Sequence, residues 1–133
     1  RYLDDTIAQA RERGYVETIM GRRRYFPELT QHTINQTVQN AAERAAVNMP
    51  IQGSAADILK VAMIQLHDRL QSGSLDAHMI LQVHDELVLE VAEKDLAAAT
   101  DLLVETMSNA AKLRVPLKVD VSVGKNWMEM KNG

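Results

Sequence analysis

The stretch Met79-Ile80-Leu81-Gln82-Val83-His84-Asp85-Glu86-Leu87-Val88-Leu89-Glu90-Val91 contains two short apolar runs separated by three polar residues. Runs of this length, rich in aliphatic and β-branched residues, predict strands, and the polar residues between them predict a turn. The two strands then form an antiparallel hairpin. Its register stays open, because an odd-length turn pairs Val83 with Leu87 and a two-residue turn does not.

This turn carries two adjacent carboxylates, Asp85 and Glu86, and no glycine. Tight hairpin turns favour glycine, because it adopts positive φ without steric cost. Neighbouring carboxylates repel each other, and Mg²⁺, which prefers oxygen ligands, would remove that repulsion. A solvated charged turn is the alternative interpretation. A zinc site is disfavoured, because no second His or Cys lies at ligand spacing from His84.

The rest of the chain alternates between helical patterns and short β-prone runs, with glycine and proline at the breaks. This order predicts an α+β fold with helices on one face of an antiparallel sheet, and its closing part resembles a ferredoxin-like fold that lacks a strand. In chain order, the predicted elements are a helix over 2–13 ended by Gly14, a hairpin over 15–26 turned at Gly21, a polar connector over 28–33, a helix over 34–49, a helical stretch from 51 to Gly73, strands over 79–83 and 87–91, a helix over 93–113 and a final strand over 117–123.

Pro50 interrupts the middle of the long helical pattern. The residue before a proline is biased away from helical geometry. Ser54 and Asp57 have the spacing of a capping box, which would begin a new helix. A kinked but continuous helix is the open alternative.

Arg44, Asn48 and Gln52 recur every four residues, so they form one stripe if the helix persists. These side chains suit the acceptors of the DNA minor groove, which look nearly the same for every base pair. An ordinary solvent face is the alternative. The small residues beside the stripe would let a bulky partner approach closely; they are Ala45, Ala46 and Gly53.

Composition narrows the class of protein. The chain has 133 residues, 46% hydrophobic and 25% charged, which predicts one compact globular unit. Its net charge of −3 is unusual for a nucleic-acid binder, and the one dense basic cluster, Arg22-Arg23-Arg24, is either a set of phosphate contacts or an exposed basic loop. No apolar run approaches the roughly 20 residues that span a bilayer. The absence of cysteine fits a reducing cytoplasm.

Taken together, these segments resemble the polymerase domain of family A, the bacterial DNA polymerase I-like enzymes. The resemblance covers nearly the whole chain in order, and the Gln-Val-His-Asp-Glu segment is similar to the family's motif C. It departs from the common pattern at Gln39, where Arg is frequent, and at Ser54, where Thr is frequent. The matching segments are Gly14–Thr18, Gly21–Tyr25, Ala42–Ala46, Pro50–Ile58, Gln82–Leu87, Val115–Val121 and Gly124–Trp127.

The resemblance implies a role for each candidate residue. Asp85 and Glu86 would be the catalytic carboxylates and would bind two Mg²⁺ ions, with Glu86 in the more peripheral role. His84 would lie near the primer terminus. The stripe residues match family positions that touch the minor groove of the template–primer, and they are Arg44, Asn48 and Gln52.

The resemblance also implies template-directed DNA synthesis from dNTPs, in DNA replication and repair, in the bacterial cytoplasm or nucleoid and away from membranes. Residues 1–50 would connect fingers and palm, and residues 51–133 would belong to the palm. The chain begins without Met and holds neither the family's other catalytic Asp nor its dNTP-binding helix, so it is expected to be a fragment that is inactive without the remainder of the polymerase chain. The alternatives are a non-catalytic nucleic-acid-binding module on the same palm scaffold and a ferredoxin-like interaction domain.

Overall fold

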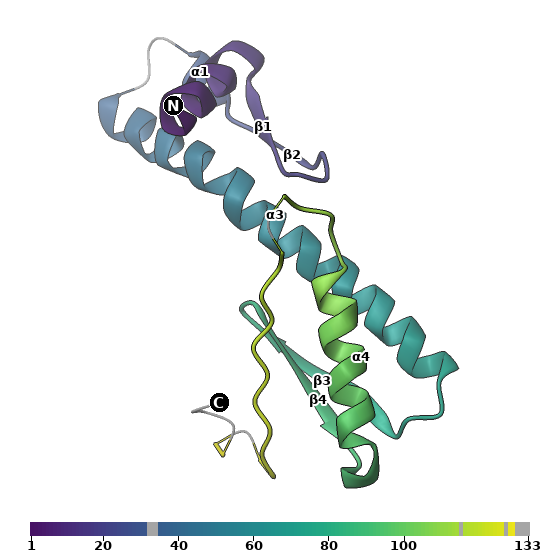
Figure 1. The fold of residues 1–133 in the computed structure, drawn as a ribbon. Helices are drawn as coiled ribbons and strands as arrows, with labels where there is room; N and C mark the ends of the chain where they lie inside the picture. The colour runs from purple at the N-terminus through teal and green to yellow at the C-terminus, as the bar shows by residue number, and fades with distance from the viewer. Residues whose placement is uncertain (32–34, 115, 127, 130–133) are drawn as a thin grey trace. The chain divides into compact units, whose positions relative to one another are not determined.

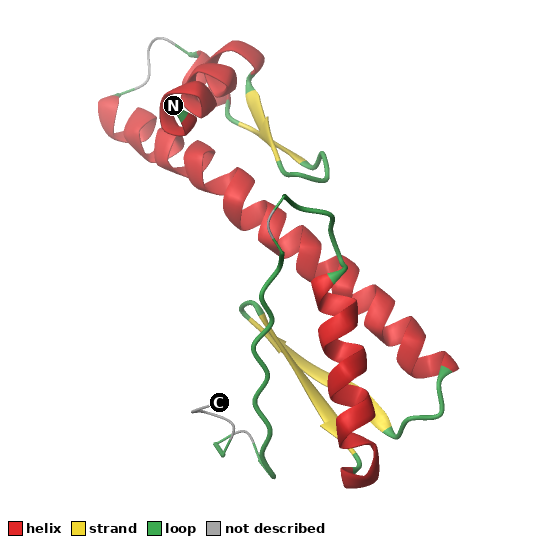
Figure 2. Cartoon of the chain, viewed as in Figure 1, coloured by secondary structure: helices red, strands yellow, loops and turns green. Residues whose placement is uncertain are grey.

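A computed structural model describes residues 1–31, 35–114, 116–126 and 128–129 (Figures 1 and 2). The chain divides into two compact units, Arg1–Asp57 and Ile58–Gly133, where its length predicted one. Helix α3, Gln36–Ser72, belongs to both. At about 1.5 Å per residue, this helix is about 55 Å long, which exceeds the span of one small core.

The first unit begins with helix α1, Tyr2–Arg13, as predicted. Gly14 ends the helix in the left-handed region, with φ 82°, and its N–H donates to the carbonyl of Ala10. Strands β1, Tyr15–Glu17, and β2, Arg23–Tyr25, then form the predicted small hairpin. The loop between these strands spans residues 18–22 and is therefore longer than a turn at Gly21 alone.

The side chain of Thr18 stabilises the loop between β1 and β2. The hydroxyl of Thr18 accepts hydrogen bonds from the backbone N–H groups of Met20 and Arg22. These N–H groups therefore bond within the loop and do not extend the strand ladder. After β2, helix α2, Pro27–Thr30, replaces the first part of the predicted polar connector, because proline fits the first position of a helix.

The core of the first unit gathers around Phe26, whose side chain is buried. Helices α1 and α3 and the segments between them all contribute to it. The buried residues of this cluster are Ala10, Val16, Phe26, Leu29, Ala42, Ala46 and Met49.

Helix α3 continues without a break through Pro50, so of the two alternatives that the sequence left open the continuous helix is observed and a new start at Ser54 is not. The Ser54 hydroxyl accepts a hydrogen bond from the N–H of Ile19 at 2.8 Å, and the Asp57 carboxylate pairs with Arg22 at 2.9 Å. Both side chains bind the hairpin loop and not their own helix. The predicted start of this helix, at residue 34, lies outside the described residues.

The second unit contains the acidic hairpin that the sequence predicts. Strands β3, Ala77–Val83, and β4, Glu86–Val91, pair antiparallel, and Val83 lies opposite Glu86. The turn therefore has two residues, which settles the register. The register shifts by one residue between Met79 and Leu81, so the strand contains a bulge near its middle.

A short 3₁₀ turn, η1 (Glu93–Asp95), leads into helix α4, Leu96–Ser108, which ends five residues before the predicted end at 113. The backbone N–H and the side-chain amide of Asn109 both donate to the carbonyl of Glu105 at the helix end. Helix α4 lies beside the second half of α3, where Arg69 donates to Thr106 at 3.1 Å (Figure 1).

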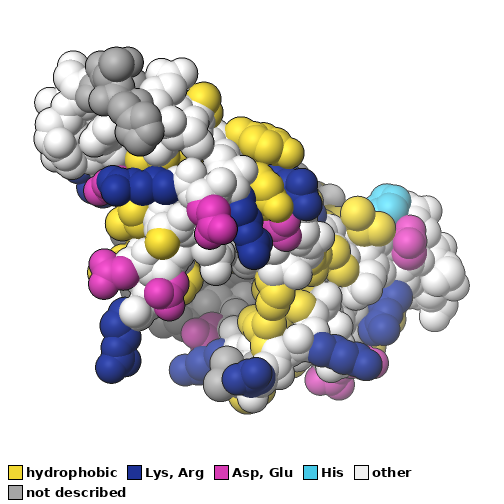
Figure 3. Space-filling model, turned by 90° about the horizontal axis from the view of Figure 1, so that it is seen from above, with side chains coloured by type: hydrophobic (Ala, Val, Ile, Leu, Met, Phe, Trp, Pro, Cys, Tyr) yellow, Lys and Arg dark blue, Asp and Glu magenta, His cyan; other side chains and the backbone are white. Residues whose placement is uncertain are grey.

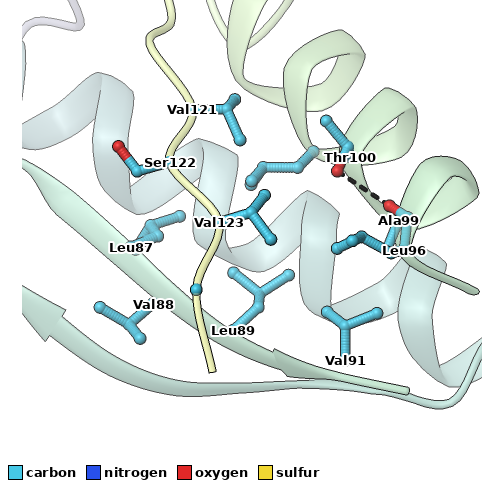
Figure 4. Close-up of a pocket in the computed structure, with 12 residues that line it drawn as sticks. Leu87, Val88, Leu89, Val91, Leu96, Ala99, Thr100, Val121, Ser122 and Val123 are labelled. Carbon is cyan, nitrogen blue, oxygen red and sulfur yellow. Dashed lines mark hydrogen bonds between the residues drawn. The ribbon is translucent and has the colours of Figure 1, made fainter. Parts of the chain in front are cut away.

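The predicted final strand over 117–123 is wrong. Residues 116–124 belong to no helix or strand. A strand requires a hydrogen-bonded neighbour, and β3 and β4 pair with each other alone among the described residues. The side chains of Val121 and Val123 point toward a pocket between β4 and α4, lined also by Leu87, Leu89 and Leu96 (Figure 4). The α+β class is confirmed, as one long helix with two small antiparallel hairpins, and without a ferredoxin-like sheet.

Candidate functional site

The tip of the second hairpin holds the predicted acidic residues. His84 and Asp85 form the two-residue turn and Glu86 is the first residue of β4. All three side chains are exposed. The side-chain amide of Gln82, in β3 just before the turn, donates to the carbonyl of His84 and so stabilises the turn.

His84 has a φ of 53°, the one positive φ among the described non-glycine residues. The first position of a two-residue hairpin turn commonly takes such a φ and then favours glycine. For other residues, left-handed backbone costs about 1–2 kcal/mol. Strained residues of this kind cluster at active sites and binding loops, and the tip holds one beside its two acids.

The acid pair by itself offers too few ligands for a complete metal site. No group of three His, Cys, Asp or Glu side chains able to hold an ion occurs in the part of the chain that the structure describes. Asp85 and Glu86 therefore fit an ion that keeps waters and takes phosphate oxygens, as Mg²⁺ does. Further protein ligands would have to come from elsewhere.

The predicted stripe of Arg44, Asn48 and Gln52 lies along α3, and all three side chains are exposed. The buried residues of α3 in this unit lie on the opposite side of the helix, because successive residues are about 100° apart. The stripe is thus open to a partner. The buried residues are Ala42, Ala46, Met49, Gly53 and Asp57.

The small residues beside the stripe have a different role from the predicted one. Ala46 is fully buried in the core cluster, and Ala45 packs against that cluster. A Cβ atom on Gly53 would lie 2.8 Å from Cγ2 of Thr18. Ala46 therefore packs against the interior of the unit, and Gly53 packs against the hairpin loop.

The three arginines of the basic cluster differ in their partners. Arg22 pairs with Asp57 and also donates to the carbonyl of Gly53 at 3.4 Å. Arg23 pairs with Glu17 at 3.0 Å within the hairpin. The guanidinium carbon of Arg24 lies 5.0 Å from the centre of the Phe26 ring. Arg24 has no carboxylate partner among the described residues.

Two tyrosines and a glutamate surround the guanidinium of Arg23. A hydrogen bond with Tyr25 raises the pKa of Arg23 above its ordinary value. Tyr15, whose ring centre lies 4.2 Å from the guanidinium carbon, and Glu17 add to that effect.

On the face of the molecule drawn in Figure 3, basic side chains are scattered and acidic ones lie among them. Any electrostatic attraction for nucleic acid on that face is therefore local.

Sequence reasoning missed the residues that fasten the first hairpin to α3. Ser54 and Asp57 form this attachment with the N–H of Ile19 and the side chain of Arg22. Gly53 was the available signal, since a glycine inside a helix often marks a close approach. Its partner could not be identified without knowing which segment folds back onto the helix.

Among the described residues, no helix has both the length and the apolar character needed to cross a membrane.

Comparison with known proteins gives the family. The model of DNA polymerase family A matches residues 1–129. The chain is 52% identical over 130 residues to the thermostable DNA polymerase I of Thermus filiformis, and 47% identical over 131 residues to DNA polymerase I of Bacillus caldotenax. Each match covers 98% of this chain and 15% of the relative.

A solved structure supports the same family assignment. The POL domain of Pol1 from M. smegmatis, in complex with DNA primer-template and dNTP, superposes with a TM-score of 0.92 and 50% identity, over 97% of this chain and 22% of that one. The match extends over both hairpins and the long helix between them. The chain therefore belongs to DNA polymerase family A.

Proposed function

We propose that this chain forms part of a DNA polymerase that performs template-directed DNA synthesis in replication and repair. The observation that carries the proposal is the exposed acid pair at the tip of a tight, strained hairpin, in a chain that matches the family over residues 1–129. The M. smegmatis relative was solved with primer-template DNA and dNTP, which supports the same partners here. The relatives are bacterial, and the corresponding site of action is the cytoplasm or nucleoid.

Asp85 is the proposed principal metal ligand. Asp85 lies in the turn and Glu86 begins β4, so the two carboxylates are not expected to reach one ion equally. Asp85 would bind Mg²⁺ and Glu86 would support the site from beside it. Bound Mg²⁺ supplies the charge that favours ionisation of the primer 3′-hydroxyl and stabilises the departing pyrophosphate.

The exposed stripe of Arg44, Asn48 and Gln52 is the proposed contact with the minor groove of the template–primer. Its donors can reach the acceptors that every base pair presents there. Arg24 is the strongest phosphate-contact candidate of the basic cluster, because Arg22 and Arg23 already pair with carboxylates. His84 is proposed to lie near the primer terminus.

Residues 51–133 are proposed to belong to the palm, and residues 1–50 to connect it with the fingers. The extended segment 117–123 has strand-like alternation but no ladder, which fits a sheet that gains a strand from elsewhere in the longer polymerase. We expect that strand to bring the second catalytic carboxylate. On this proposal, the 133-residue chain holds only part of the active site.

The test is a chimera in which residues 1–129 replace the corresponding segment of the Thermus filiformis enzyme. Asp85→Asn keeps the shape of the side chain and removes its charge. It should lower the single-turnover rate of primer extension by about 10²–10³-fold or more, the range seen when one transition-state stabiliser is lost. Affinity for primer-template should stay within about threefold, since the phosphate and groove contacts remain.

The matched control is Glu90→Gln, which neutralises another exposed carboxylate of β4 away from the tip. It should extend primers at the parental rate. Equal activity of both variants would show that Asp85 has no catalytic role. A chimera that binds primer-template but never extends it would instead favour the non-catalytic binding module.

A further inference from the structure

The loop of the first hairpin is fastened to one short stretch of α3. The N–H of Ile19 donates to the Ser54 hydroxyl at 2.8 Å, and Nε of Arg22 donates to the Asp57 carboxylate at 2.9 Å. Arg22 also reaches the carbonyl of Gly53 at 3.4 Å. Every one of these contacts is made to the helix after Pro50.

Helix α3 has its least resistance to bending at Pro50. Proline has no N–H, so the carbonyl of Ala46 loses its usual helical donor, and the proline ring crowds the same carbonyl. Such positions are where helices bend. Asn48 precedes this point and Gln52 follows it, so the distance between these two exposed side chains depends on how the helix passes through Pro50.

The hairpin loop touches the helix without covering the stripe. Gly53 and Asp57 are buried beneath the loop, whereas Asn48 and Gln52 remain exposed. The approach is close, since a Cβ atom on Gly53 would meet Cγ2 of Thr18 at 2.8 Å. The loop therefore supports the helix from the side opposite to the stripe.

We propose that this loop is a splint that fixes the position of Gln52 relative to Asn48. Arg22, Ser54 and Asp57 are then positioning residues for the minor-groove contact, and they touch no DNA themselves. The inference rests on the proposed function, because it assumes that Gln52 reads the groove. It also takes Arg22 out of the set of phosphate contacts.

The burial of Asp57 supports that assignment of Arg22. The Asp57 side chain is only 9% exposed, and Arg22 forms an ion pair with it. Losing an ion-pair partner is destabilising for a buried carboxylate. An Arg22 that turned away to contact a phosphate would give up this ion pair and its hydrogen bond.

The experiment uses the chimera described above and primer-templates with adenine or 3-deazaadenine near the primer end. The analogue lacks the N3 acceptor of the minor groove and keeps the pairing edge. The measured quantity is the acceptor ratio, defined as the single-turnover extension rate with adenine divided by that with 3-deazaadenine. One hydrogen bond predicts a ratio of about threefold to tenfold for the parental chimera at the position that Gln52 contacts.

Gln52→Ala identifies that position, because there it should bring the acceptor ratio close to one. Arg22→Gln and Ser54→Ala should lower the ratio at the same position, although neither residue touches the base. The matched control is Arg11→Gln, which removes an arginine–carboxylate pair to Glu43, on the part of α3 before Pro50. It should keep the parental ratio, and so should Ser54→Thr, which retains the hydroxyl.

The outcomes separate the two proposals. A parental acceptor ratio of one at every position, or a ratio that Gln52→Ala leaves unchanged, would overturn the proposed groove contact. A ratio that Gln52→Ala abolishes, but that Arg22→Gln and Ser54→Ala leave intact, would overturn the splint alone. If Arg22→Gln does not fold, Ser54→Ala decides, because it removes a single oxygen atom.

Discussion

His84 adopts a backbone conformation that glycine would adopt more easily. Its positive φ would suit glycine, yet the position carries an imidazole beside two carboxylates. Backbone strain of this kind persists where the surrounding structure over-determines it. The paired strands β3 and β4 and the hydrogen bond from Gln82 provide that constraint here.

His84→Gly should therefore leave the chain as stable or slightly more stable. Glycine removes a strain of about 1–2 kcal/mol and adds an entropic cost of about 0.5–1 kcal/mol. His84→Val, with a branched Cβ at the same φ, should lower the free energy of unfolding by at least about 1 kcal/mol. Urea denaturation of the 133-residue chain, followed by circular dichroism, measures both. A valine variant as stable as the glycine variant would contradict the strain.

At this scale the sequence predicted where the candidate residues lie better than what they contact. Asp85 and Glu86 could be placed at a hairpin tip because the flanking apolar runs are local signals. The partners of Arg22, Arg23 and Arg24 could not be predicted, because three identical neighbours are distinguished only by tertiary contacts.

At the scale of elements, the contact between the first hairpin and α3 is close enough to reverse an ordinary preference. Alanine normally stabilises a helix interior by about 1 kcal/mol relative to glycine. At Gly53 the added methyl group would meet Cγ2 of Thr18 at 2.8 Å. The methyl group of Thr18 should thus decide the sign of the effect.

Gly53→Ala alone should lower the free energy of unfolding by about 1–3 kcal/mol, as overpacking does. In the Thr18→Ser background, which keeps the hydroxyl and removes the methyl group, the same change should be neutral or stabilising by up to about 1 kcal/mol. Thermal unfolding of the four chains completes the double-mutant cycle. Equal effects of Gly53→Ala in both backgrounds would mean that the loop does not press on the helix there.

Local elements were predicted well and long-range pairing poorly. The helix over 2–13 and both hairpins follow from periodicity and from glycine at the breaks, signals that lie within each segment. The strand over 117–123 was wrong because alternation shows that a segment can form a strand and not that a partner exists. The capping-box alternative is not observed for a similar reason, since Ser54 and Asp57 found partners in the hairpin loop.

At the scale of the whole molecule, the chain spans about 15% of the length of the curated relatives it matches. The sequence motifs predicted the family correctly, because several of them occur together and in order. They did not predict two compact units. That division follows from the length of α3, and continuity through Pro50 could not be decided from the proline alone.

The 133-residue chain by itself should not extend a primer. On the proposed function it holds only part of the active site, and no group of three metal-binding side chains occurs among its described residues. Primer extension with highly purified chain, with and without Mg²⁺, measures this, and an Asp85→Asn chain controls for contaminating polymerase. Extension that survives purification and disappears in the Asp85→Asn chain would show that the segment is catalytically complete.

Counting bound metal ions would show whether Asp85 is a metal ligand. The chimera is saturated with a dideoxy-terminated primer-template and the matching dNTP, and bound Mn²⁺ is titrated by electron paramagnetic resonance. The parental chimera and Glu90→Gln should bind the same number of ions, and Asp85→Asn should bind at least one fewer or bind Mn²⁺ at least about tenfold more weakly. An Asp85→Asn chimera with the parental number of ions and the parental affinity would contradict the proposed site.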